Sequence, residues 1–219
     1  MIKVSPSILG ADFLNLVPQL EIMKAAGTDM IHIDVMDGNF VPNISFGMPI
    51  INSIKKHTTL PLDVHLMIDQ PHRYIKDFAT AADILGFHYE AGSPVRSTLT
   101  EIRKLGCKTC LTIKPKTEPS EIFEFLELCD MVLVMSVEPG FGGQSFIMNS
   151  LQKLSTLKAE CEKRNLLVDL EVDGGINAET AVLAVNAGAT VLVAGNYIFN
   201  SDNIAETVKC LKSLNPVHP

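Results

Sequence analysis

The feature that most constrains the fold of this chain is a regular alternation of short apolar runs with longer amphipathic segments. Runs rich in Val, Ile and Leu predict eight β-strands, at 3–6, 30–34, 62–66, 84–88, 108–113, 131–135, 167–172 and 190–194. Segments of helical periodicity follow them in turn, at 16–26, 49–56, 71–81, 95–105, 118–128, 149–163, 178–187 and 204–211. Strands and helices that alternate in this way form parallel βα units, and strands this apolar are covered on both faces.

Two arrangements of such units compete, a closed (β/α)₈ barrel and an open doubly wound sheet. A barrel needs about 200–250 residues, and the chain has 219. The open sheet requires a topological switch point and usually has fewer strands in this length. We therefore predict α/β architecture with one domain over 1–219, a single (β/α)₈ TIM barrel with a short tail, at about 214–219, that frays.

The composition excludes several classes of protein. A hydrophobic fraction of 47% and a charged fraction of 20% are typical of a soluble globular domain. The net charge of −7 argues against nucleic acid or an anionic membrane as the main partner. No apolar run approaches the about 18 residues of a transmembrane helix, and the first residues lack the apolar core of a secretory signal. We expect a cytoplasmic protein that binds neither nucleic acid nor membrane.

The five cysteines, at 107, 110, 129, 161 and 210, form no disulfide framework. An odd number in a chain of this kind predicts free thiols. Cys107 and Cys110 match a C-x-x-C pattern, but residues three apart on a strand face opposite ways. We interpret the match as chance and expect Cys110 in the core.

Polar side chains that can bind a metal stand near the ends of several predicted strands. His32 and Asp34 share one face of the second strand, His65 lies on the third, Asp173 ends the seventh, and Ser7 follows the first. Each has an ordinary alternative: His65 could bond to a buried carbonyl, and Asp173 could cap a turn. All carboxyl ends of a parallel barrel open on one face, which holds the active site. The two imidazoles and two carboxylates therefore predict a site for one divalent ion, Zn²⁺, Fe²⁺, Mn²⁺ or Co²⁺.

Glycine-rich stretches follow the last three predicted strands. They are 138–145 (EPGFGGQS), Gly174-Gly175 and Gly195-Asn196. Glycine lets backbone N–H groups approach a phosphate closely, and barrels commonly bind phosphate in the loops after strands seven and eight. Glycine also serves tight turns, but three such loops together predict a phosphate site made by main-chain amides. None of the three stretches contains Lys or Arg.

Three methionines, Met36, Met67 and Met135, lie at or just beyond strand ends. Methionine usually fills gaps in a core. At the rim of this site, the alternative is an apolar lid that excludes water from a carbanion-like intermediate.

With these residues identified, the sequence resembles the ribulose-phosphate 3-epimerase family. The matching stretches cover nearly the whole chain in order, and as a set they are highly specific. They are 5–9 (SPSIL), 32–38 (HIDVMDG), 40–43 (FVPN), 63–67 (DVHLM), Met135 with 139–144 (PGFGGQ), 171–175 (EVDGG) and 194–195 (AG).

The resemblance implies an enzyme that interconverts D-ribulose 5-phosphate and D-xylulose 5-phosphate. It implies a metal held by His32, Asp34, His65 and Asp173, with Asp34 and Asp173 as the acid/base pair on opposite faces of C3. It also implies the residues that hold the ketopentose phosphate: Ser7, His65, Gly140, Phe141, Gly142, Gly143, Asp173, Gly174, Gly175, Gly195 and Asn196. The family usually has Ser where this chain has Asn196, so phosphate affinity depends on whether the backbone N–H or the hydroxyl is the donor.

The proposed chemistry suits these residues. Inversion at C3 beside a C2 ketone removes a weakly acidic proton, and a metal that binds the C2 and C3 oxygens would stabilise the cis-enediolate. A base on one face and an acid on the other then invert the centre, which requires two carboxylates. We expect no organic cofactor, because no G-x-G-x-x-G follows the first strand.

Other functions remain open at this point. The nearest is a 3-epimerase of a related ketose phosphate such as allulose 6-phosphate. A barrel decarboxylase or aldolase would leave the two histidines without a purpose, and a non-catalytic sugar-phosphate-binding barrel would not need the acid/base set. We also expect a homo-oligomer, whose size the sequence does not specify.

Overall fold

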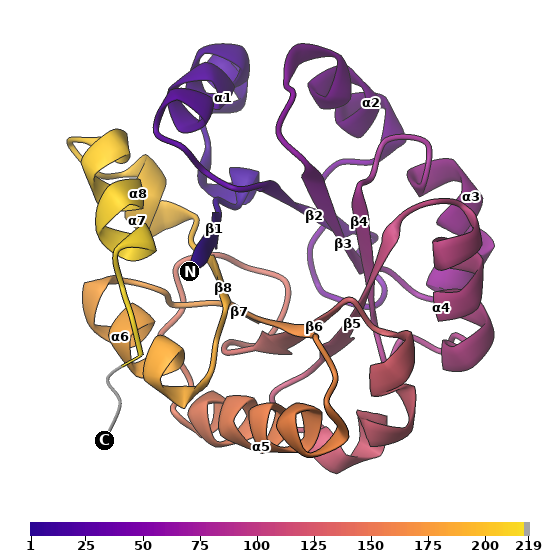
Figure 1. Ribbon diagram of the computed structural model, residues 1–219. Helices are drawn as coiled ribbons and strands as arrows, with labels where there is room; N and C mark the ends of the chain where they lie inside the picture. Colours follow the sequence, from indigo (N-terminus) through magenta and orange to yellow (C-terminus); the bar gives the residue numbers. More distant parts are fainter. Residues whose placement is uncertain (217–219) are drawn as a thin grey trace.

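The computed structural model describes residues 1–216, and its centre is a ring of eight parallel strands (Figure 1). The strands are β1 (Lys3–Ser5), β2 (Ile31–Met36), β3 (Leu62–Met67), β4 (Ile84–His88), β5 (Lys108–Ile113), β6 (Met131–Met135), β7 (Asp169–Asp173) and β8 (Val191–Val193). From β2 to β8 each strand pairs with the next one in the sequence, and β8 pairs with β1, where Lys3 lies beside Val191. A bridge between Ser7 and His32 closes the remaining seam between β1 and β2. The predicted (β/α)₈ barrel is confirmed.

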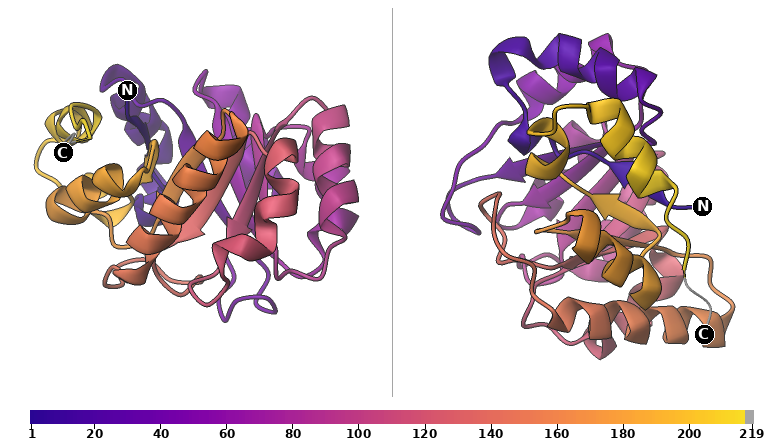
Figure 2. Two further views of the ribbon diagram at one scale, coloured as in Figure 1. Left: turned by 60° about the horizontal axis from the view of Figure 1, so that its bottom comes forward. Right: turned by 90° about the vertical axis from the view of Figure 1, so that its left-hand side faces the viewer.

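Helices surround the ring, and the side views show them packed against the outside of the strands (Figure 2). The α-helices are α1 (Leu16–Ala25), α2 (Met48–His57), α3 (Ile75–Phe78), α4 (Val95–Lys104), α5 (Asn149–Arg164), α6 (Ala178–Ala187), α7 (Asn196–Phe199) and α8 (Ile204–Lys212). Four 3₁₀ helices accompany them: η1 (Ile8–Gly10), η2 (Phe13–Asn15), η3 (Pro71–Arg73) and η4 (Pro119–Leu128). The last helix returns to the first, since Lys212 Nζ donates to Gly27 O at 2.7 Å and to Asp29 Oδ1 at 2.8 Å.

Three helical segments differ from the prediction. The helix expected at 71–81 is divided into η3 and the four-residue α3, and the Thr80 hydroxyl donates to Asp77 O at 2.7 Å, a bond that competes with a longer helix. The segment expected at 118–128 is the 3₁₀ helix η4 rather than an α-helix. Helix α7 was not predicted, because four residues are too few to show helical periodicity.

The two faces of the ring have different surroundings. Ile31, Ile33 and Val35 of β2 point outward into one large apolar cluster between the strands and the helices. The inward-facing positions alternate with them, as expected for a strand. Inside the ring a smaller apolar cluster gathers mainly side chains of β4, β5, β6 and β8: Met30, Ile84, Cys110, Met131, Leu133, Met135, Val137 and Val191. Apart from Met36 and Met67, the inward positions of β2, β3 and β7 are polar, and they build the site described below.

Several smaller expectations can be compared with the structure. The five cysteines are free thiols, and Cys110 is buried inside the ring, both as predicted. Within residues 1–216, no helix has both the length and the apolar character needed to cross a membrane. Of the tail expected to fray, Leu214 packs partly buried against the core, and 217–219 lie outside the described residues.

Candidate active site

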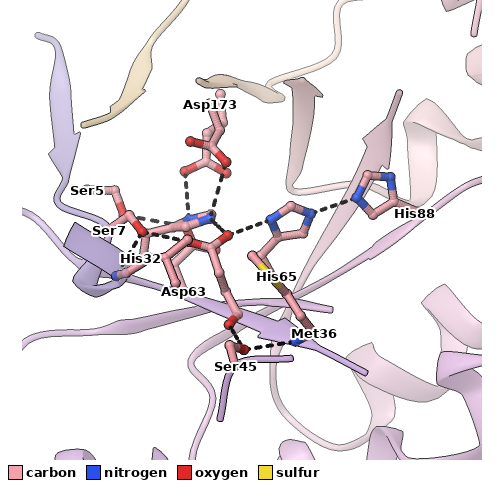
Figure 3. Close-up of polar contacts among 12 residues, drawn as sticks. Ser5, Ser7, His32, Met36, Ser45, Asp63, His65, His88 and Asp173 are labelled. Atoms are coloured by element: carbon pink, nitrogen blue, oxygen red, sulfur yellow. Dashed lines mark hydrogen bonds and ion pairs between the residues drawn. The ribbon is translucent and has the colours of Figure 1, made fainter. Parts of the chain in front are cut away.

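The four residues predicted as metal ligands come together from three strands, β2, β3 and β7, and Figure 3 labels three of them, His32, His65 and Asp173. One ligand atom of each lies within 4.8 Å of the ligand atoms of the others: His32, Asp34, His65 and Asp173. Asp34 Oδ1 is 3.3 Å from His32 Nε2 and 3.2 Å from His65 Nδ1. Asp173 Oδ2 is 4.0 Å from His32 Nε2. The pairing register of β2 and β3 sets Asp34 beside His65, which explains how residues distant in sequence converge.

A hydrogen bond on the far side of His32 decides what this histidine offers to the site. Its Nδ1 lies 2.7 Å from Asp63 Oδ2, and an ionised carboxylate can only accept, so the ring proton belongs on Nδ1. A metal binds only the neutral ring, in which Nε2 then carries a lone pair. This Nε2 is buried and has no hydrogen-bond partner among the described residues. A buried lone pair that faces two carboxylates fits a bound cation, which would satisfy all three groups.

The charges of the cluster depend strongly on one another. Burial alone would lower the pKa of His32, but the carboxylates of Asp34 and Asp63 outweigh it and hold that pKa well above its usual range. Burial would raise the pKa of Asp34, yet the charge of His32 and the contact of its ring with this carboxylate hold that pKa well below its usual range. Burial, followed by the charge of Asp34, raises the pKa of Asp173 to about 7. Two carboxyl groups whose pKa values are pushed apart in one site suit general acid–base chemistry.

A cavity of about 480 Å³ opens above the cluster, which is within the usual range for a small-molecule site. Asp34 and Asp173 both line it. Ten of the residues predicted to hold substrate also line it: Ser7, Gly140, Phe141, Gly142, Gly143, Asp173, Gly174, Gly175, Gly195 and Asn196. His65, the remaining one, is 1% exposed and lies below the cavity wall. Its ring therefore faces the cluster of ligands rather than the open space.

The loops after β6, β7 and β8 form one end of this cavity. Gly175 has a φ of +64°, and a Cβ there would lie 2.6 Å from the backbone N of Phe146, so the position requires glycine on two counts. Gly143 has a φ of +75°. Helix α7 begins at Asn196, directly after β8. A short extra helix in this position is a common part of phosphate sites in barrels.

Comparison with known proteins decides the family. The model of the ribulose-phosphate 3 epimerase family matches residues 3–199. The chain belongs to this family. It is 46% identical over 211 residues to the ribulose-phosphate 3-epimerase of Synechocystis sp., with 94% of this chain and 91% of that protein covered. It is also 46% identical over 207 residues to the ribulose-phosphate 3-epimerase of Bacillus subtilis, with 93% and 94% covered.

Solved structures add support for the fold alone. Orotidine 5'-phosphate decarboxylase from Pyrococcus horikoshii OT3 has a TM-score of 0.64 with 18% sequence identity, over 96% of this chain and 97% of that one. At this identity the likeness carries the barrel architecture and nothing about the chemistry.

Asn196 lies between two glycines of the cavity. A Cβ on Gly10 would be 3.0 Å from Asn196 Oδ1, and one on Gly143 would be 3.1 Å from Asn196 Nδ2. The carboxamide therefore spans the space between the loop after β1 and the loop after β6. Its backbone N–H belongs to the first turn of α7, which leaves that donor free of the helix's own hydrogen bonds.

Ser7 and the three methionines have surroundings that the sequence did not specify. The Ser7 hydroxyl donates to Asp34 Oδ2 at 2.6 Å, so it holds a carboxylate as well as lining the cavity. Met36, Met67 and Met135 are each at most 4% exposed, and all three line the cavity. Met36 and Met67 form a small apolar cluster with Val41. An apolar wall beside the carboxylates is compatible with the predicted lid.

Four polar residues around the site were not predicted: Asp63, His88, Glu90 and Glu171. The sequence did contain a signal for three of them. His88 ends a predicted strand at the same rim, and the two acidic residues at 63 and 171 stand two positions before predicted ligands, hence on the same inward face. Glu90 follows β4 in a loop and had no such signal.

Glu171 lies beneath the cluster and is fully buried. Neither of its carboxyl oxygens has a hydrogen-bond partner among the described residues. Burial, and then the charge of Asp63, raises the pKa of Glu171 well above its usual range. Its surroundings therefore favour the protonated, uncharged form of this carboxyl group.

Proposed function

We propose that this chain is a metal-dependent epimerase that interconverts D-ribulose 5-phosphate and D-xylulose 5-phosphate. Membership of the family supports the reaction. The observation that carries the mechanism is the convergence of two carboxylates and two imidazoles at the floor of one cavity. A binding protein without catalysis would need the cavity but not this set of groups.

His32, Asp34, His65 and Asp173 would hold one divalent ion. Two nitrogen and two carboxylate ligands suit Zn²⁺, Fe²⁺, Mn²⁺ or Co²⁺. When bound, such an ion acts as a Lewis acid that polarises the ketone and stabilises the negative charge that develops beside it. The orphaned Nε2 of His32 is the strongest local support for the ion.

Asp34 and Asp173 are the two groups that move the proton at C3. They come from different strands, β2 and β7, so they can address a sugar carbon from two directions. One removes the proton and the other returns a proton to the opposite face, which inverts the centre. The Ser7 hydroxyl orients Asp34, while the half-buried Asp173 reaches the cavity directly.

The other parts of the cavity orient the substrate. Main-chain amides at Gly142–Gly143, Gly174–Gly175 and Gly195–Asn196 bind the phosphate, helped by the first turn of α7. Met36, Met67 and Met135 exclude water from the reacting carbon. With the phosphate held at one end and the acid/base pair at the other, C3 is brought between the two carboxylates.

Assembly and location are also part of this proposal. A homo-oligomer is supported by exposed apolar side chains on η2 and α1, where Phe13 is 48%, Leu14 94% and Val17 45% exposed. A cytoplasmic location is supported by the five free thiols. Light scattering of the purified protein tests the first, and fractionation of the source cells tests the second.

One preparation can test the function. Bound metal is measured by elemental analysis, and turnover is compared for D-ribulose 5-phosphate and D-allulose 6-phosphate. We expect a metal close to one per chain, a clear preference for the pentose phosphate, and loss of activity on chelation that added Mn²⁺ or Zn²⁺ restores. Full activity in verified metal-free protein would contradict the metal, and preference for the hexose phosphate would reassign the substrate.

A further inference from the structure

A series of polar contacts leads outward from the candidate ligands to His88 and Glu90, two residues that have no part in the proposed function. His65 Nδ1 faces Asp34 Oδ1 at 3.2 Å, and on the other side of the ring His65 Nε2 lies 2.9 Å from His88 Nε2 (Figure 3). His88 Nδ1 lies 3.3 Å from Glu90 Oε2. Both histidines are buried, at 1% and 0% exposure. Both contacts are therefore shielded from bulk water.

The contact between the two ring nitrogens couples the tautomers of the histidines. A hydrogen bond between two neutral imidazoles needs one nitrogen that donates and one that accepts. If His88 Nε2 accepts, His65 must carry its proton on Nε2, and its Nδ1 is a lone pair. If His88 Nε2 donates, the His65 proton moves to Nδ1, and the nitrogen that faces Asp34 can no longer bind a metal.

Glu90 decides between these two arrangements. Its Oε1 accepts from the backbone N–H of Lys114 at 2.8 Å and from the Thr117 hydroxyl. Burial alone would raise the pKa of Glu90, but the hydrogen bonds from His88, Thr117 and Lys114 outweigh it and lower that pKa to about 2. The group is an anion at neutral pH and can only accept, so His88 carries its proton on Nδ1.

The anionic Glu90 sets which atom donates and which accepts in each hydrogen bond of this series. His88 Nε2 is left as the acceptor, His65 donates from Nε2, and His65 Nδ1 turns a lone pair toward Asp34 Oδ1. Two lone pairs that face each other at 3.2 Å repel unless a cation lies between them. In its neutral form His32 has the same arrangement, with Asp63 in the place of His88 and Glu90.

Packing keeps the His88 ring in the orientation that this relay requires. The Phe40 ring covers it, with centroids 4.8 Å apart, and Lys114 Nζ lies 3.6 Å from the centroid of Phe40. The ring therefore cannot flip to exchange its two nitrogens without displacing the loop after β2.

We propose that Glu90 and His88 are positioning residues that hold His65 as its Nε2–H tautomer, so that Nδ1 is ready to bind a divalent metal. The proposal rests on the metal-ligand role of His65 given under the proposed function. Neither residue touches substrate; each acts through His65. Partners of this kind around a metal-bound histidine typically contribute about 10–100-fold in metal affinity.

Glu90→Gln is the decisive variant, because it keeps the shape and changes one acceptor into a donor. Lys114 N–H and Thr117 hold the amide oxygen, so the amide nitrogen faces His88 Nδ1 and donates to it. His88 then donates from Nε2, and His65 is forced to carry its proton on Nδ1. We expect Mn²⁺ affinity, measured by electron paramagnetic resonance titration, to fall about 10–100-fold. A matched control, Thr117→Val, removes another hydrogen bond from the same carboxylate but leaves the anion, and its affinity should change less than about threefold.

A second readout does not depend on metal affinity. In metal-free wild type, ¹⁵N imidazole spectra should show His65 as Nε2–H and His88 as Nδ1–H, and in Glu90→Gln both should switch. Wild-type spectra with His65 as Nδ1–H would overturn the proposal even if the variant failed to fold. Equal Mn²⁺ affinity in wild type and Glu90→Gln would overturn it as well. Failure of the proposed function looks different: wild type itself would bind no Mn²⁺, or His65→Ala would bind it as tightly as wild type.

Discussion

The two ends of the cavity are built from different parts of the chain. At the proposed metal end, the candidate ligands are side chains on the strands β2, β3 and β7, and hydrogen bonds from neighbouring residues hold several of them, such as the bond from Ser7 to Asp34. At the phosphate end, glycines in the loops after β6, β7 and β8 leave room for main-chain amides. The function of the first end should therefore depend on which atoms its side chains carry. The function of the second end should depend on the room that glycine leaves beside the main-chain amides.

The largest effect should come from changing one atom at the metal end. Asp173→Asn and Asp34→Asn should each lower kcat by at least about 10²–10⁴-fold, because each removes one acid/base group. In deuterated water a variant that keeps its metal should still exchange the C3 proton of one epimer faster than it epimerises. The two variants should prefer opposite epimers.

The same experiment requires metal analysis of each variant, since both residues are candidate ligands. Equal loss of exchange from both epimers in metal-loaded protein would break the assignment of one base to each face. So would epimerisation near the wild-type rate.

At the phosphate end, an added methyl group should matter more than a change of charge. Gly175→Ala places a Cβ at a φ of +64° and 2.6 Å from the Phe146 backbone N. We expect a rise in KM of tenfold or more with a smaller change in kcat, and a loss of stability of about 1–3 kcal/mol from backbone strain. Gly47→Ala is the control, because a Cβ there meets no atom within 4 Å. Steady-state kinetics would measure KM and kcat, and urea unfolding would measure stability. Equal values for Gly175→Ala and Gly47→Ala would contradict the prediction.

The metal end should also show a dependence of stability on pH that the phosphate end lacks. The pKa of Asp173 is raised to about 7 in the fold, so the folded state binds this proton more tightly than the unfolded state does. Its contribution to the free energy of unfolding of metal-free protein is present below the unfolded pKa of about 4 and is lost as the pH rises to about 7. Compared with wild type, Asp173→Asn should therefore lose less stability between pH 5 and pH 8 in urea unfolding. Identical slopes would show that Asp173 is already ionised in the metal-free fold.

The smallest effect should come from Asn196→Ser. If main-chain amides bind the phosphate, the change should alter KM by less than about threefold, since the backbone N–H at the start of α7 is retained. A larger change in KM, in either direction, would show that the side chain at position 196 contributes to phosphate binding. The phosphate end would then depend on side-chain chemistry as the metal end does.

The barrel and the convergence of the four candidate ligands could be predicted because each follows from a short-range pattern. His32 and Asp34 are two residues apart on one strand and therefore share a face. The parallel topology brings His65 and Asp173 to the same rim. The relay through His88 and Glu90 could not be predicted, because it depends on which ring nitrogens face each other across two strands. The hydrogen bond from Ser7 to Asp34 was missed for a similar reason, since it crosses the seam between β1 and β2.

The pairing of β1 with β8 has a consequence for how the chain is made. Lys3 pairs with Val191, so β1 and β8 cannot pair until a further 188 residues have been synthesised after Lys3. At about 5–20 residues per second of synthesis, that wait is about 10–40 s. During this time the growing sheet has unpaired edges, which can pair with strands of other chains. The closed ring that later protects every strand therefore cannot form until β8 has been made, and the nascent chain is open to strand pairing with other chains until then.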